Sequence, residues 1–94
     1  MPKTLLEKVN YLLTIAKTKD FSQDDLKNIE TLTSDDSEHP RLGKVFGYSV
    51  AEYAIATLKW INEEDLYKSF TKGLDEYKKG RITDLIESRC YQQI

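Results

Sequence analysis

The chain has 94 residues, of which 39% are hydrophobic and 32% are charged, and its formal net charge is −2. This length leaves no room for a second hydrophobic core, and the composition excludes a disordered chain. The near-neutral net charge does not by itself favour any class of partner. We therefore expect one globular domain that covers residues 1–94.

The sequence predicts neither secretion nor membrane insertion. Glu7 and Lys8 interrupt the N-terminal apolar run, and no small-residue cleavage site follows, so we expect no signal peptide. Cys90 is the only cysteine, which excludes an internal disulfide. The most apolar segment, residues 45–61, is short and contains two charges, which argues against a membrane span. A cytoplasmic protein is the expectation.

Capping patterns predict the first two helices. Thr4 and Glu7 have the spacing of a capping box, so a helix should begin near Leu5 and end around residues 17–19. Ser22 is expected to cap a second helix of two to three turns. Two acids follow it in the first turn, where the helix dipole favours negative charge.

A loop and a central helix are expected next. Residues 33–40 contain no apolar side chain and predict a loop. Residues 44–61 carry only three charges, which fall within an arc of roughly 80° when they are placed on a helix. We therefore predict a helix over about residues 44–61 that is buried on most sides. Gly47, Ala51 and Ala54 share one face of it, where another helix could approach closely.

The last third of the chain predicts two more helices. Asn62 is expected to cap a helix whose apolar face includes Phe70 and Tyr77. Residues 78–80, Lys-Lys-Gly, predict its end, because cations and a left-handed glycine favour a helix C-terminus. A short helix should then cover about residues 82–90. No segment alternates with the two-residue period of a strand. The predicted fold is all-α, a compact bundle of four to five helices around the central helix.

The sequence offers little material for catalysis or metal binding. His39 and Cys90 are the only residues of their types and lie in unrelated contexts. The acids at 24–25 and 63–65 stand in predicted first turns, where acids are expected without any catalytic role. The loop at 35–39 lacks the glycine and alternating ligands of a calcium loop, and one histidine does not make a zinc site. We expect no catalytic residue, metal site or cofactor, and no enzyme activity.

A basic segment leaves one alternative function open. Lys78, Lys79 and Arg81 lie between two predicted helices and resemble, in outline, the turn of a helix-turn-helix. Asp84 and Glu87 would face the phosphates, which argues against this reading. The alternative prediction is a small helical nucleic-acid-associated regulator that uses the three bases. Helix C-capping by the cations is the structural explanation of the same residues.

A charge asymmetry carries the main functional prediction. Residues 20–38 contain seven acids and one base, Lys27, and so carry −6, whereas the rest of the chain carries +4. A segment of this charge predicts a docking surface for a basic protein, and a solvated acidic helix and loop is the structural alternative. The predicted partner-binding residues are Asp24, Asp25, Glu30, Asp35, Asp36 and Glu38.

In size, predicted helical fold and acidic segment, the chain is similar in kind to small bacterial immunity proteins and phage-encoded inhibitors. The tripeptide Glu38-His39-Pro40 resembles the Glu-His-Pro found after the second helix of colicin-nuclease immunity proteins. The Gly, Asp and paired Tyr that follow it there are absent here. The resemblance implies a non-enzymatic protein that binds and blocks one target. Nucleic acid and membrane are not expected as partners, and self-association stays open.

Overall fold

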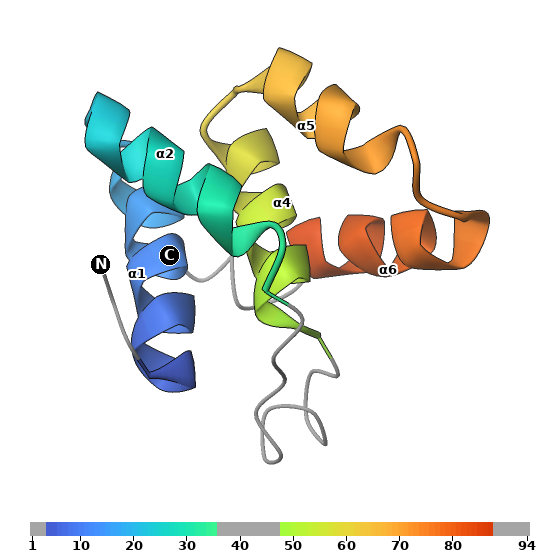
Figure 1. The fold of residues 1–94 in the computed structure, drawn as a ribbon, viewed down its shortest axis with the longest axis horizontal. Coiled ribbons are helices and arrows are strands. Elements are labelled where there is room, and N and C mark those ends of the chain that lie inside the picture. The colour runs from blue at the N-terminus through green and yellow to red at the C-terminus, as the bar shows by residue number, and fades with distance from the viewer. Residues whose placement is uncertain (1–3, 36–47, 88–94) are drawn as a thin grey trace.

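The computed structural model describes residues 4–35 and 48–87 (Figure 1). Among these residues the chain forms five helices and no strand, which confirms the all-α prediction. The helices are α1 (Leu5–Thr18), α2 (Gln23–Leu32), α4 (Val50–Trp60), α5 (Glu64–Thr71) and α6 (Glu76–Ile86).

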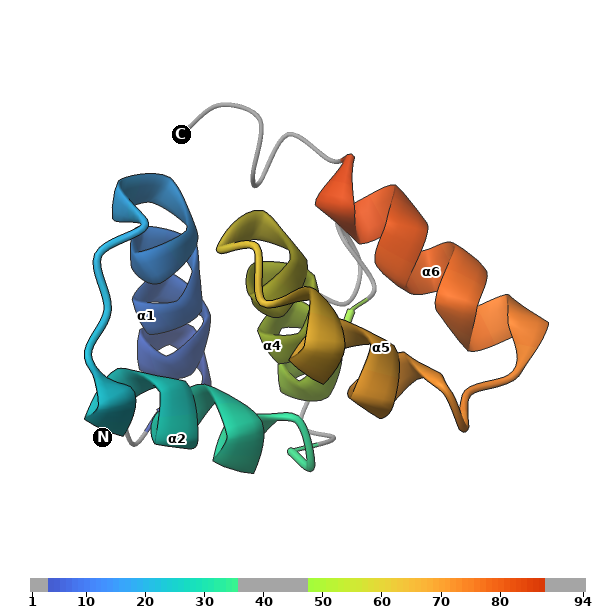
Figure 2. The ribbon, with the colours of Figure 1, turned by 90° about the horizontal axis from the view of Figure 1, so that it is seen from above.

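Helix α4 lies at the centre of the bundle. It lies between α1 and α6 in the two perpendicular views of Figure 1 and Figure 2. It also contacts α2 and α5, and every extensive contact between described helices includes α4. Eight of its eleven residues are buried. The prediction of a bundle around a mostly buried central helix is therefore confirmed.

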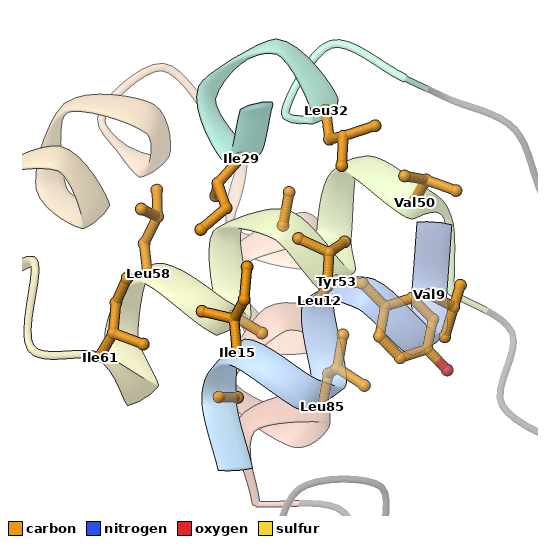
Figure 3. Packing of buried hydrophobic residues seen from close by; sticks show 13 residues of the cluster. Val9, Leu12, Ile15, Ile29, Leu32, Val50, Tyr53, Leu58, Ile61 and Leu85 are labelled. Atoms are coloured by element: carbon orange, nitrogen blue, oxygen red, sulfur yellow. The ribbon is translucent and has the colours of Figure 1, made fainter. Parts of the chain in front are cut away.

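The hydrophobic core joins side chains from α1, α2, α4 and α6. Figure 3 shows the side chains of α1, α2 and α4 converging. Small residues of α4, Ala54 and Ala56, are fully buried and let the neighbouring helices pack closely. The buried cluster consists of Val9, Leu12, Ile15, Ala16, Ile29, Leu32, Val50, Tyr53, Ala54, Ala56, Leu58, Ile61 and Leu85.

Two polar contacts support this core. Thr57 is buried, and its Oγ1 donates to the carbonyl oxygen of Tyr53 at 2.9 Å, so its burial leaves no unpaired hydroxyl. Trp60 lies at the end of α4, where its indole Nε1 donates to the carbonyl oxygen of Ile86 at 3.1 Å. The second bond joins the C-terminal ends of α4 and α6.

The first two helices begin where the capping patterns predict. Thr4 Oγ1 accepts from the backbone N–H of Glu7 at 3.2 Å. Ser22 and Asp25 form a complete capping box, in which each side chain accepts from the other's backbone N–H at 3.1 and 3.0 Å. The end of α1 at Thr18 also agrees with the prediction. Local side-chain chemistry therefore determines both helix starts.

The predicted start of the central helix is wrong. Helix α4 begins at Val50, because Ser49 has an extended backbone and caps it. Ser49 and Glu52 form a second complete capping box. Tyr48 and Ser49, which the apolar pattern placed inside the helix, precede it. Residues 44–47, including the glycine of the predicted close approach, lie outside the described residues.

The predicted boundary near residue 80 is also wrong. Helix α5 ends at Thr71, and Asp75 then caps α6 by accepting from the backbone N–H of Lys78 at 2.8 Å. Residues 78–80 therefore lie inside α6 and do not end a helix. Asn62 does not cap α5 either, because its backbone is left-handed, with φ at 64°.

The break between α5 and α6 changes the environment of Tyr77. The predicted apolar face ran through Phe70 to Tyr77 in one helix. Phe70 is half-buried and packs against the core, but Tyr77 is 72% exposed. The two side chains belong to different helices, so their spacing in the sequence does not place them on one face.

Gly80 supplies a test of the α6 boundary. It lies within α6, and a Cβ added there would meet no atom within 4 Å apart from its chain neighbours and the backbone of its own helix. Gly80→Ala should therefore stabilise the fold by about 1 kcal/mol through helix propensity. For a chain of this size the expected rise in melting temperature is about 4–8 °C, measured by circular dichroism. A lower melting temperature would instead support the predicted left-handed cap at Gly80.

Candidate functional site

The predicted acidic surface lies on α2 and the turn that follows it. Four of its six residues are described, and Asp36 and Glu38 lie outside the described residues. Asp24 is exposed and Glu30 is half-buried. Neither side chain forms a hydrogen bond or ion pair with another residue of the described ranges. These two acids therefore present charge to the solvent.

Asp25 has a different role, because it joins α2 to α1. Its Oδ1 accepts from the hydroxyl of Tyr11 at 2.5 Å, and its Oδ2 accepts from the backbone N–H of Ser22. Asn28 donates to the same Tyr11 hydroxyl at 3.2 Å. The hydrogen bond from Tyr11, followed by that from Ser22, lowers the pKa of Asp25, whereas burial and the carboxylate raise the pKa of Tyr11. The carboxylate is thus ionised and fixed in orientation.

Asp35 also serves the fold. Its Oδ2 accepts from Lys8 Nζ at 2.6 Å, and the two side chains are 17% and 22% exposed. Its backbone oxygen accepts from the N–H of Ala51 at 2.7 Å. These bonds fasten the segment after α2 to both α1 and α4. The four described site residues therefore divide into outward charges and internal contacts, and their use by a partner stays a prediction.

A groove lies between α1 and α2, which cross rather than run side by side (Figure 1 and Figure 2). Its volume is about 440 Å³, and it opens to solvent. Carboxylates come from both helices, and the described residues that line it include no base. The lining residues are Glu7, Asn10, Tyr11, Thr14, Ile15 and Asp25.

The sequence did not predict this groove. Glu7 belongs to α1, outside the acidic segment, and only the crossing of the helices places it at the same groove as Asp25. The polar face of α1 gave a partial signal, since Glu7, Asn10 and Thr14 lie within two turns of one another on the exposed side. That pattern is typical of any solvated helix face, so it did not indicate a groove.

A second polar cluster joins α4 to α6. Arg81 donates from Nε and Nη2 to the two carboxylate oxygens of Glu52 at 2.8 and 3.1 Å. The side chains are 26% and 13% exposed. The guanidinium also lies 5.0 Å from the ring centre of Tyr48 and 5.7 Å from that of Tyr77. Arg81 is therefore held by a carboxylate and two aromatic rings.

The charges of this pair respond to one another. Burial alone raises the pKa of Glu52, but hydrogen bonds from Arg81 and from the backbone of Ser49 outweigh it, so the pKa is lowered. The bonds to Glu52 in turn raise the pKa of Arg81 further above its ordinary value. Both groups are ionised at neutral pH. The pair is a structural contact between α4 and α6.

Among the described residues, the structure lacks the turn between two helices that suggested nucleic-acid binding by Lys78, Lys79 and Arg81. The basic segment lies within α6 and is not a turn between two helices. Arg81 is bound to Glu52, whereas Lys78 is exposed and Lys79 is half-buried. The three bases therefore do not form the helix-turn-helix arrangement that the sequence resembled.

Other reactive groups give no further site. Among residues 4–35 and 48–87, no three or more His, Cys, Asp or Glu side chains are grouped to hold a metal ion. His39 and Cys90 lie outside these ranges. Of the acids at 63–65, Glu64 pairs with Lys59 at 2.7 Å. No helix in the described part of the chain has the length and apolar character needed to cross a membrane.

Comparison with known proteins adds no relative to this picture. The sequence matches no protein-family model and no curated protein, and the structure matches no solved structure.

The bond between Tyr11 and Asp25 can be tested by titration. Tyr11→Phe removes the hydroxyl donor, so the pKa of Asp25 should rise toward its ordinary value of 3.8. Carboxyl-carbon NMR across an acid titration measures this change. Tyr77→Phe is the matched control, because Tyr77 is exposed on α6, and it should leave the pKa of Asp25 unchanged. An unchanged pKa in Tyr11→Phe would show that the bond does not form in solution.

The Glu52–Arg81 pair predicts a stability change. Glu52→Gln should lower the free energy of unfolding by about 1–3 kcal/mol, because it weakens a charged, partly buried contact. Glu64→Gln breaks the exposed pair with Lys59 and should cost only about 0–1 kcal/mol. Urea unfolding of both variants measures the difference. Equal losses would contradict the special role of the Glu52 pair.

The same pair predicts a pH dependence. Because folding lowers the pKa of Glu52, its contribution to stability is fully present above its ordinary value of 4.5. The contribution is lost as the pH falls through the lowered folded-state pKa. The stability difference between the wild type and Glu52→Gln should therefore shrink below about pH 4.5.

Proposed function

We propose that this protein is a non-enzymatic protein-binding domain that docks a basic partner through residues 20–38. An immunity or inhibitor protein, which blocks one target, is the concrete form of the proposal. The observation that carries it is the charge of α2 and its flanks. In the described part, residues 20–35, five acids accompany a single base, Lys27.

The acids of residues 20–35 fall into two groups, those that contact neighbouring helices and those that face the solvent. Asp25 and Asp35 hold α2 against its neighbours. Asp20 and Asp24 are exposed and Glu30 is half-buried, and within the described residues their side chains form no ion pair. These three acids are the charges that a partner would meet first. Their field reaches about 8 Å at physiological ionic strength, so they would speed the encounter with a basic surface.

The test compares two triple variants once the partner has been captured from the host and identified. The docking variant combines Asp20→Asn, Asp24→Asn and Glu30→Gln. The control variant combines Glu76→Gln, Asp84→Asn and Glu87→Gln, three exposed acids of α6 and its end. Each variant removes three negative charges, and each includes one acid from the first turn of a helix.

The docking variant should lower the association rate by about tenfold, because it removes the steering charge. The control variant should change this rate much less, and added salt should slow the wild type most. Stopped-flow mixing measures the rates, and circular dichroism verifies that all variants are folded. Equal rates for the wild type and the docking variant, with no dependence on salt, would leave the acids as a solvated face and overturn the proposal.

A further inference from the structure

The groove between α1 and α2 has a chemistry that the acidic segment alone does not have. It combines two carboxylates from different helices, Glu7 and Asp25, with the less polar lining of Tyr11 and Thr14. We propose that this groove receives a lysine or arginine side chain of the partner. This inference rests on the proposed function and deepens it, because it names the residue type that the partner inserts.

The groove fits a basic side chain in both its parts. Lysine and arginine have a long alkyl stem that packs on apolar surface and a cation that seeks polar partners. The ring of Tyr11 and the methyl group of Thr14 offer surface for the stem, whereas Ile15 at the same groove is buried in the core. Glu7 and Asp25 offer acceptors for the cation, and a charge-assisted hydrogen bond is stronger than a neutral one. A neutral or anionic side chain would form no charge-assisted hydrogen bond with Glu7 or Asp25.

One of the acceptors is fixed before a partner arrives. Asp25 accepts from the Tyr11 hydroxyl and from the backbone of Ser22, so its orientation is set from two sides. Each carboxylate oxygen has a second lone pair, which leaves acceptor capacity for a cation. An acceptor that is already ordered loses little conformational entropy on binding. The same hydrogen bonds lower the pKa of Asp25, so it stays charged.

The position of the groove connects it with the outward charges. Asp24 adjoins Asp25 in the sequence but is exposed, and Glu7 lies one helical turn before Tyr11. A basic partner that is attracted by the exposed acids would therefore reach the groove next. Binding energy in protein interfaces concentrates in a few side chains that enter such hollows. The groove would slow dissociation of the partner by binding its side chain, and the exposed acids would speed its association.

Short peptides test the groove without the partner. The probes are acetyl-Gly-Arg-Gly-amide, its lysine analogue, and its citrulline analogue, which keeps the shape of arginine without its charge. Each is titrated to about 50 mM into nitrogen-15-labelled protein, a range suited to millimolar affinity. Amide shifts should concentrate in residues 7–15 and 22–28 with the two basic peptides. Citrulline should produce little change there.

Variants connect these shifts with the carboxylates. Glu7→Gln should weaken the binding of the arginine peptide by about threefold or more, because it removes one of two charges. Glu87→Gln, an equal change at an exposed site beyond α6, should leave the affinity unchanged. Shifts scattered over the whole surface, equal binding of citrulline, or no binding would each overturn the inference.

The outcome is separate from that of the proposed function. If the peptides fail while the docking triple variant still slows association, the groove is not the anchor and the acidic docking surface stands. If the basic peptides bind in the groove, Glu7→Gln should also speed dissociation of the identified partner. An unchanged dissociation rate would overturn the groove as an anchor for that partner.

Discussion

The burial of α4 is the constraint on which the rest of the structure depends. Eight of the eleven residues of α4 are buried, and exposing their mostly apolar side chains to water would be unfavourable. Neighbouring helices must therefore cover α4 from several sides. Each of α1, α2, α5 and α6 contacts it. Because these helices use one face for α4, their outer faces are free to carry charge. The acids of α2 and the groove beside α1 are consequences of that arrangement.

Most of the fold could be predicted from the sequence where the signals are local. Thr4 and Ser22 cap helices through residues three positions away, so the starts of α1 and α2 needed no knowledge of the tertiary structure. Prediction failed where two local signals competed. The apolar run hid the capping box of Ser49. The Lys-Lys-Gly pattern predicted a helix end at residue 80, and the cap at Asp75 was missed, although both are short-range patterns.

The candidate site was predictable only in part, because its contacts join distant segments. The charge of residues 20–38 is visible in the sequence, and Asp24 is exposed in the structure. The use of Asp35 by Lys8, 27 positions away, depends on how α1 lies against the end of α2. The pairing of Arg81 with Glu52, 29 positions away, likewise depends on the packing of α4 against α6. The apolar periodicity of the sequence does not reveal pairs between residues so far apart.

The position of Trp60 has a spectroscopic consequence. It is the only tryptophan of the chain, and its indole nitrogen donates across the contact between α4 and α6 to Ile86. Detachment of α6 would break this bond and hydrate the ring, whereas a rearrangement confined to the start of α1 would leave it in place. The tryptophan fluorescence therefore reports on the contact between α4 and α6 and on the core against which Trp60 packs. The protein therefore contains its own probe for the separation of α6 from α4.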